Sequence, residues 1–229
     1  MIWVWERFVI ANFIYTYHMA QKKNYYAHKR SELIEQVEPG ARRVLEVGCG
    51  VGNTSAAIKI DRQAREVWGV EVVPDAAQKA MDNPAIDRVF CGDIAVLVED
   101  LPENGFSHIV AGDVIEHLVD PWTSLQRLYS RLEPGGKFIC SIPNIRTLSF
   151  VSKLLFTKRF EYKDSGVLDR THLRFFARKD IEIMFQGAGF TDIKITALTA
   201  GKNTIKRIGR FIFKDLVLKR FLIIAYKKA

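Results

Sequence analysis

The chain has 229 residues, which is enough for one domain with a full hydrophobic core and too few for two such domains. Its 48% hydrophobic and 26% charged residues exclude an intrinsically disordered chain. The net charge is +8, but nine of the 34 basic residues and one of the 26 acidic residues lie in segment 202–229, so the rest of the chain is neutral. Three widely spaced cysteines exclude a disulfide framework and indicate a reducing compartment.

The N-terminal stretch MIWVWERFVIANFIY is apolar and aromatic but contains Glu6 and Arg7. These charges are not typical of a secretory signal, and the stretch is shorter than the about 20 apolar residues of a transmembrane helix. We expect residues 1–40 to form a helical segment that packs on the domain or on a partner. The alternative is an interfacial membrane anchor.

Strands and helices alternate from residue 42 onward. Apolar runs bounded by turn residues predict strands at 43–47, 66–73, 88–91, 107–112, 137–142, 190–198 and 221–227. Helical patterns lie between them, at 53–60, 76–81, 122–132 and 178–186. This order predicts an α/β fold with a doubly wound, mostly parallel seven-stranded sheet whose last strand is antiparallel.

The strongest motif is VLEVGCGVG at residues 44–52, where an apolar strand runs into Gly48, Gly50 and Gly52 and then into a helix. Glycines permit a tight turn and let backbone N–H groups approach a ligand closely. The spacing lacks the Gly-x-x-Gly end of the dinucleotide fingerprint. Glu46, two residues before the glycines, suits a cationic amino-acid head group, whereas it would repel a pyrophosphate.

Two further acids follow predicted strands. Glu71 lies at the tip of the second strand, where a carboxylate can accept hydrogen bonds from both hydroxyls of a ribose. The alternative is an exposed acid at a strand end. Asp93, in the sequence Gly92-Asp93-Ile94 after the third strand, can accept a hydrogen bond from an adenine amino group while Ile94 packs on the ring.

These three motifs, in this order, resemble those of class I S-adenosylmethionine-dependent methyltransferases. The resemblance spans residues 40–198 and includes the blocks GDVIEHL, LEPGG, IPN, LDRTHLRFF and GAGF. The last two blocks are similar to methyltransferases of cell-surface polysaccharide and glycan biosynthesis and to ubiquinone-pathway O-methyltransferases. The resemblance implies a Rossmann-like methyltransferase fold with S-adenosylmethionine as its cofactor.

The resemblance also implies roles for single residues. The glycine motif would hold the methionine end, Glu71 the ribose, and Asp93 with Ile94 the adenine. Asp113 would lie near the sulfonium or the acceptor. The residues expected to bind the cofactor are Glu46, Gly48, Cys49, Gly50, Gly52, Glu71, Val72, Asp93, Ile94 and Asp113.

We predict one methyltransferase domain, residues 1–229, in four parts. After the N-terminal segment 1–40 come a cofactor-binding core at 41–145, a lid and acceptor segment at 146–178, and C-terminal strands at 179–229. The last part contains a basic amphipathic insertion, TIKRIGRFIFKDLVLKR. We expect this insertion to be a packed helix with a solvated basic face. Contact with an anionic membrane surface or with nucleic acid is the alternative.

His117, His172 and Asp113 are the candidate catalytic residues. Methyl transfer is an in-line displacement that depends mainly on alignment, and a general base helps when a hydroxyl acceptor must lose its proton. Either histidine could supply that base. Each could instead be a structural histidine bonded to the backbone.

The same histidines belong to a possible metal set. Asp113-x-x-Glu116-His117 with the distant His172 resembles the Glu-x-x-Glu-His plus His set of small-RNA 3′-terminal 2′-O-methyltransferases. That resemblance implies Mg²⁺ or Mn²⁺ held by two carboxylates and imidazoles. Asp113 stands where those enzymes have Glu, and its side chain is one methylene shorter. We therefore favour a reaction without a metal and keep this set as the alternative.

The lid segment combines apolar and cationic side chains. Residues 150–156 are predicted to form a helix with an apolar inner face. Asn144, Arg170 and Arg174 are the expected substrate-binding residues, and the two arginines suit a sugar that bears phosphate or diphosphate.

These features predict a cytoplasmic methyltransferase that O-methylates a hydroxyl on a sugar or glycan-lipid precursor. Two alternatives stay open: a metal-dependent RNA 2′-O-methyltransferase, and a non-catalytic cofactor-binding or scaffold subunit. The favoured function is compatible with peripheral membrane contact through the N-terminal aromatic or the C-terminal basic segment.

Overall fold

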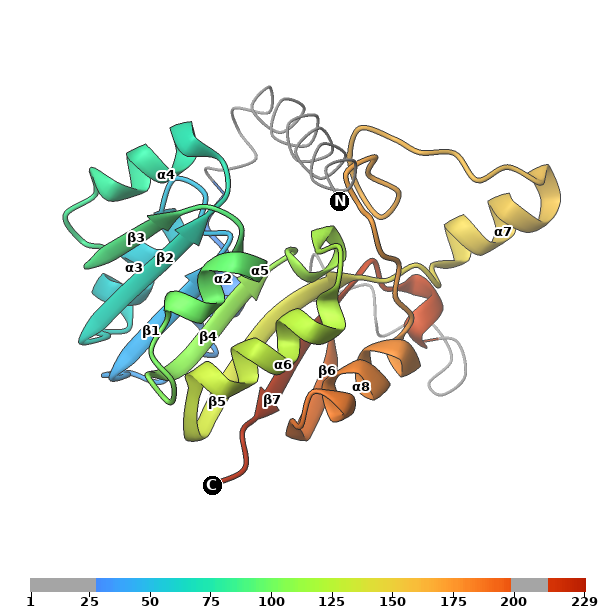
Figure 1. The fold of residues 1–229 in the computed structure, drawn as a ribbon. Coiled ribbons are helices and arrows are strands. Elements are labelled where there is room, and N and C mark those ends of the chain that lie inside the picture. The colour runs from blue at the N-terminus through green and yellow to red at the C-terminus, as the bar shows by residue number, and fades with distance from the viewer. Residues whose placement is uncertain (1–27, 199–213) are drawn as a thin grey trace, which may run out of the picture. The chain divides into compact units, whose positions relative to one another are not determined.

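The computed structural model describes residues 28–198 and 214–229 (Figure 1). The prediction for the N-terminal aromatic stretch lies outside the described residues, and so do residues 204–213 of the basic insertion. The end of that insertion is described and contains a 3-10 helix at Lys214–Val217 and the first residue of a strand, Arg220, instead of one continuous helix. The chain divides into two compact units, residues 1–100 and 101–229, and each is described by itself. The domain borders predicted at residues 41, 146 and 179 stay predictions.

The first unit contains three parallel strands in the order β3-β2-β1. Nearly every residue of the first two is buried, which is typical of parallel strands covered on both faces. The strands are β1 (Arg43–Val47), β2 (Glu66–Glu71) and β3 (Arg88–Cys91). The helices are α2 (Ser31–Ile34), α3 (Asn53–Asp61), α4 (Pro74–Met81), α5 (Ile94–Leu97) and the 3-10 helix η1 (Val98–Asp100).

The second unit contains four strands in the order β4-β5-β7-β6. β4 (Phe106–Gly112) pairs in parallel with β5 (Leu132–Pro143). β7 (Arg220–Tyr226) is antiparallel to both β5 and β6 (Thr191–Leu198). The helices are η2 (Ile115–His117), α6 (Pro121–Arg131), α7 (Leu148–Thr157), α8 (Arg178–Gly187) and η4 (Lys214–Val217).

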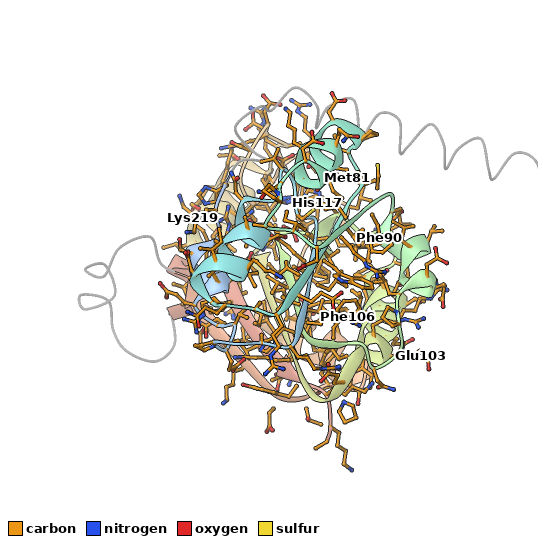
Figure 2. The ribbon with its side chains drawn as sticks, turned by 90° about the vertical axis from the view of Figure 1, so that its left-hand side faces the viewer. Met81, Phe90, Glu103, Phe106, His117 and Lys219 are labelled. Atoms are coloured by element: carbon orange, nitrogen blue, oxygen red, sulfur yellow. The ribbon has the colours of Figure 1, made fainter. Side chains whose placement is uncertain are left out.

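Aromatic side chains fill the core of the second unit. The ring of Phe138 on β5 lies 5.7 Å from that of Phe185 on α8 and 5.4 Å from that of Phe190, both edge-on. Phe106, labelled in Figure 2, begins β4 and is fully buried. Edge-to-face contacts of this kind stabilise a core beyond the burial of apolar area alone.

The seven strands and the antiparallel β7 confirm the predicted fold class. The boundaries of six strands match the predicted ones within two residues, but β5 begins at Leu132 rather than at Lys137. Leu132 pairs with Phe106 and Lys137 with His108, so residues 133–136 form an irregularity inside the strand. Gly135 has a φ of +74°, as in a turn, but the sheet pairing continues on both sides of it.

One prediction for the lid segment is wrong. The helix α7 forms, but within the described part of the chain none of its ten residues is buried. Of the expected apolar inner face, Phe150 contacts the Phe160 ring at 5.4 Å, but Leu155 is 69% and Phe156 80% exposed. Figure 1 shows the reason, because α7 stands away from the strands of the second unit. None of the helices in the described residues is long and apolar enough to cross a membrane.

Candidate functional site

The glycine motif forms the loop between β1 and α3. Gly48, Gly50 and Gly52 have φ values of +71°, +57° and +86°, in the left-handed region that glycine adopts without strain. A Cβ atom at Gly52 would also lie 2.4 Å from the side chain of Ile86. The Gly48 and Cys49 N–H groups donate to the Val70 carbonyl at 2.8 and 3.1 Å, which ties the loop to β2.

Glu71 connects the glycine loop to the ends of the neighbouring strands. Its carboxylate is 4% exposed and accepts hydrogen bonds from the Gly50 N–H at 2.8 Å and the Val73 N–H at 2.9 Å. Its carbonyl accepts from the Gly92 N–H at 2.9 Å. Burial raises the pKa of this carboxyl, and the backbone N–H groups partly oppose the shift. The predicted cofactor residues from three strand ends are thus brought together.

Asp93 already has a structural partner. It caps α5, since its side chain accepts a hydrogen bond from the Ala95 N–H at 2.9 Å, and Ile94 behind it is buried. Cys49 is also buried, and a Cβ at Gly69 in β2 would lie 2.7 Å from its sulfur. Gly69 was missed in the sequence, although a glycine inside a strand often marks such a close approach.

Glu46, near the end of β1, is a buried acid suited to a cation. It is 4% exposed and accepts a hydrogen bond from the Ser55 hydroxyl. Burial raises the pKa of Glu46 to about 8, although the Ser55 hydrogen bonds and the charge of Arg30 act in the opposite direction. A positively charged group beside it would restore the ionised form. The ammonium and sulfonium groups of S-adenosylmethionine are such cations, so this residue fits the implied cofactor.

Replacing Glu46 with glutamine is expected to make the ligand-free protein more resistant to alkali. Because the folded pKa of about 8 lies above the ordinary value of 4.5, the folded state loses stability as pH rises between them. Between about pH 5 and about pH 9 the wild type should lose about 1 kcal/mol or more relative to Glu46→Gln. Urea denaturation at both pH values measures this.

The matched control for that experiment is Glu66→Gln at the start of β2. Arg43 and Trp68 hydrogen bonds hold the pKa of Glu66 below its ordinary value, so its contribution has the opposite sign. Equal pH dependence of the wild type and Glu46→Gln would show that Glu46 ionises as readily in the fold as in water.

Two histidine rings meet in the second unit. His117 ends η2, directly after β4, and its Nδ1 donates to the Thr171 carbonyl at 3.0 Å. His172 Nδ1 donates to the Val167 carbonyl at 2.9 Å. A carbonyl can only accept, so each neutral ring carries its proton on Nδ1 and its lone pair on Nε2. The ring centroids are 4.8 Å apart, edge to face.

The chain from residue 169 to 174 is fastened to η2. The Glu116 carbonyl accepts from the N–H groups of Leu173 at 2.9 Å and Arg174 at 3.0 Å. Asp169 accepts hydrogen bonds from both the N–H and the hydroxyl of Thr171. Asp169 and Thr171 were missed in the sequence, although Asp-x-Thr is a known turn pattern. Their bonds set the position of the Thr171 carbonyl, and with it the orientation of His117.

His117 (labelled in Figure 2) is neutral at physiological pH. Burial lowers its pKa to about 4, and the neighbouring His172 lowers it further than the Thr171 carbonyl can raise it. The Nε2 atom is among the buried polar atoms of the second unit. A neutral imidazole in this orientation can accept a proton or bind a metal.

Acid should destabilise the folded protein through His117. The unfolded chain, with an ordinary histidine pKa of 6.5, binds more protons than the folded chain as pH falls toward 4. Stability is therefore complete above the unfolded pKa and should fall by about 2 kcal/mol between about pH 7 and about pH 5. Urea denaturation of the wild type and of His117→Asn measures this. An equal loss in both proteins would contradict the assignment.

Asp113 bonds to residues of two other strands, and its charge acts to raise the pKa of His117. It is buried at the end of β4 with φ +53°, and it accepts a 2.7 Å hydrogen bond from the Ser141 hydroxyl. Its other carboxylate oxygen is 3.2 Å from Arg220 Nε. Ser141 and Arg220 were missed in the sequence because both belong to other strands. Asp113 thus combines a strained backbone with an ion pair, which is typical of functional sites.

The three predicted substrate residues are engaged within the fold. Asn144 is fully buried, and its side chain bonds to the backbone of Arg146, Asp215 and Leu218. Arg174 donates to the Val119 carbonyl and lies 5.9 Å from the Trp122 ring centroid. Arg170 is largely exposed and pairs with Asp164 at 3.1 Å. Their role in substrate binding stays a prediction.

One group of side chains in the described residues could hold a metal ion. The ligand atoms of Glu116, His117 and His172 all lie within 4.8 Å of one another. Two ligands of one ion are at most about 4.2 Å apart, so this group needs only a small contraction. The backbone bonds at both Nδ1 atoms match the outer partners that metal-bound histidines usually have. Asp113, the fourth member of the predicted set, instead binds Ser141 and Arg220.

Comparison with known proteins identifies relatives along most of the chain. A family model described as a methyltransferase domain matches residues 15–195. The demethylmenaquinone methyltransferase of Lactiplantibacillus plantarum is 25% identical over 76% of this chain and 81% of its own. The ubiquinone biosynthesis O-methyltransferase of Xanthomonas axonopodis pv. citri is 28% identical over 56% of this chain and 58% of its own.

A solved structure shows the same fold. The crystal structure of an S-adenosylmethionine-dependent methyltransferase from Archaeoglobus fulgidus superimposes with a TM-score of 0.65. The superposition covers 92% of this chain and 99% of that protein, at 18% sequence identity.

Proposed function

Because this chain belongs to the methyltransferase-domain family and is an S-adenosylmethionine-dependent methyltransferase, we propose that it methylates a hydroxyl oxygen of a small molecule with an apolar part. The cofactor residues of the proposal are those of the glycine loop with Glu46, Glu71 and Asp93. His117 is the proposed general base. The observation that carries the proposal is the orientation of the His117 ring, whose Nδ1 is bonded to the Thr171 carbonyl and whose Nε2 is a buried atom.

S-adenosylmethionine, when bound, supplies a methyl group on a positively charged sulfur. His117 would accept the hydroxyl proton at Nε2 as the acceptor oxygen takes that methyl group from the sulfur. The Nδ1 bond to the Thr171 carbonyl keeps the ring of His117 in one orientation throughout.

The low pKa of His117 suits positioning more than proton storage. A base with a pKa of about 4 remains unprotonated throughout the physiological range, so it is always ready to accept a hydrogen bond from the acceptor hydroxyl. Because alignment supplies most of the rate of a displacement, a correctly placed acceptor contributes even when it is a weak base.

Aromatic side chains beside the histidines favour an acceptor with an apolar part. Phe175 lies 6.3 Å from His172, between ring centroids, and it contacts Phe160 at 5.6 Å and Tyr162 at 6.2 Å. The sequence blocks favour a sugar or glycan-lipid precursor. The names of the two relatives add menaquinone and ubiquinone precursors to the candidates.

The test is transfer of labelled methyl groups from S-adenosylmethionine into a fractionated extract of the native host, with and without EDTA. Label in a lipid or glycan fraction that survives EDTA supports the proposal. Hydrolysis of that fraction then separates labelled sugars from labelled quinones. Wild-type protein that binds the cofactor but labels no fraction would contradict the proposal and favour the non-catalytic alternative.

A second candidate function is metal-dependent 2′-O-methylation of RNA. It is favoured by the grouping of Glu116, His117 and His172. Two imidazoles with one carboxylate suit Mn²⁺, Fe²⁺ or Zn²⁺ better than Mg²⁺. A bound ion would orient the acceptor oxygen and lower its pKa. Label that appears in RNA and that EDTA abolishes would place this candidate first.

A further inference from the structure

The helix α7 carries apolar side chains that are exposed to solvent. Leu148, Val151 and Leu155 recur at positions i, i+3 and i+7, so they lie along one face of the helix, and all three are exposed. Phe156 adds the most exposed of the large apolar side chains described. Scattered apolar residues are ordinary on a protein surface, but a continuous apolar ridge marks an interaction site.

Basic side chains border this ridge. Segment 148–163 contains four basic residues and one acid, which gives it a net charge of +3. The acid, Glu161, pairs with Lys153 and lies 3.7 Å from Arg159, and these cations lower its pKa. The other two basic residues are Lys158 and Lys163, both exposed. An apolar face edged by cations is the composition of helices that lie in the interface of an anionic membrane.

The ridge is held in place by stacked aromatic rings. Phe150, on the other side of α7, lies 5.4 Å from Phe160, which in turn lies 5.6 Å from Phe175. Phe150 lies on a different side of the helix from Leu155, and Leu155 and Phe156 are 69% and 80% exposed. Through Phe150, α7 is therefore in contact with the segment that contains Phe160 and Phe175.

We infer that α7 docks on the surface of an anionic lipid bilayer, with Leu148, Val151, Leu155 and Phe156 inserted among the lipid chains and Lys158, Arg159 and Lys163 against the phosphates. The helix has ten residues and is therefore about 15 Å long, enough to lie in the interface and too short to span it. The negatively charged lipid phosphates attract the basic side chains of segment 148–163, which carries a net positive charge. This inference does not depend on the identity of the methyl acceptor.

The test is co-sedimentation of the full chain with vesicles of phosphatidylcholine, alone or mixed with phosphatidylglycerol. We expect binding to the mixed vesicles that weakens with added salt. Leu155→Ser with Phe156→Ser should weaken it by roughly tenfold or more, and Lys158→Glu with Arg159→Glu should act similarly. The matched control is Ile60→Ser with Val96→Ser, because both side chains are about as exposed but lie in the first unit.

Unchanged affinity for S-adenosylmethionine in each variant shows that the fold is intact. Binding by the Leu155/Phe156 variant that equals the wild type would overturn the inference, since another part of the chain would then hold the lipid. Absence of binding by the wild type would overturn it as well. So would a dimer, measured by light scattering without lipid, that the Leu155/Phe156 variant abolishes, because a second copy would then cover the ridge.

Discussion

Replacing His117 with alanine is expected to lower kcat by roughly a hundredfold or more, with nearly unchanged affinity for S-adenosylmethionine. The ring is held by the Thr171 carbonyl and belongs to the second unit, whereas the glycine loop and Glu71 belong to the first. Loss of the ring therefore removes the proton acceptor and leaves those cofactor contacts in place. Steady-state turnover and calorimetric titration of the cofactor measure the two quantities separately.

Added imidazole provides the control for this variant. If His117 accepts the hydroxyl proton, free imidazole should restore part of the turnover of His117→Ala, since it can occupy the space that the ring leaves. The exposed His28→Ala should behave as the wild type. A parallel loss of turnover and of cofactor affinity, with no restoration by imidazole, would identify His117 as a structural residue.

Replacing Glu71 with alanine is expected to raise the Kd of S-adenosylmethionine more than tenfold, which corresponds to at least about 1.4 kcal/mol. Two losses combine in this variant. The ribose hydroxyls lose their acceptor, and the N–H groups of Gly50 and Val73 lose the carboxylate that holds them. The expected loss is mainly in affinity, because Glu71 does not touch the acceptor hydroxyl in the proposed reaction.

Glu71→Gln separates the two losses, because its amide oxygen can replace one of the two accepted backbone bonds. Its Kd should lie between those of the wild type and Glu71→Ala. The matched control is Asp75→Ala, an exposed acid on α4 in the same unit. Equal Kd values for Glu71→Ala and the wild type would remove Glu71 from the cofactor site.

The strands of the first unit could be predicted because their pattern is local. A parallel strand that is covered on both faces must be apolar along its whole length, so residues 43–47 stand out in the sequence. The glycine loop is equally readable, since left-handed φ angles and the space beside Ile86 demand glycine. These constraints act within a few neighbouring residues.

The site in the second unit could be predicted only as a set of residue types. His117 and His172 are candidates from their motifs, but their 4.8 Å separation depends on the bonds from residues 171–174 to η2. Asp113 belonged to the predicted metal set, and it is diverted by Arg220, which comes from β7 more than 100 residues later. No short-range pattern encodes contacts between such distant segments.

The exposure of α7 shows most clearly the difference between what a local pattern specifies and what contacts with distant segments decide. Its composition specifies a helix with apolar residues, and that helix forms as predicted. Whether an apolar face is buried depends on what packs against it, and this is a property of distant parts of the chain. Local preferences and apolar periodicity thus determined the helices and strands, the α/β class that follows from their alternation, and the glycine loop. The histidine pair, the ion pair of Asp113 and the open ridge of α7 arose from tertiary contacts, because burial and hydrogen bonding are decided by neighbours in space.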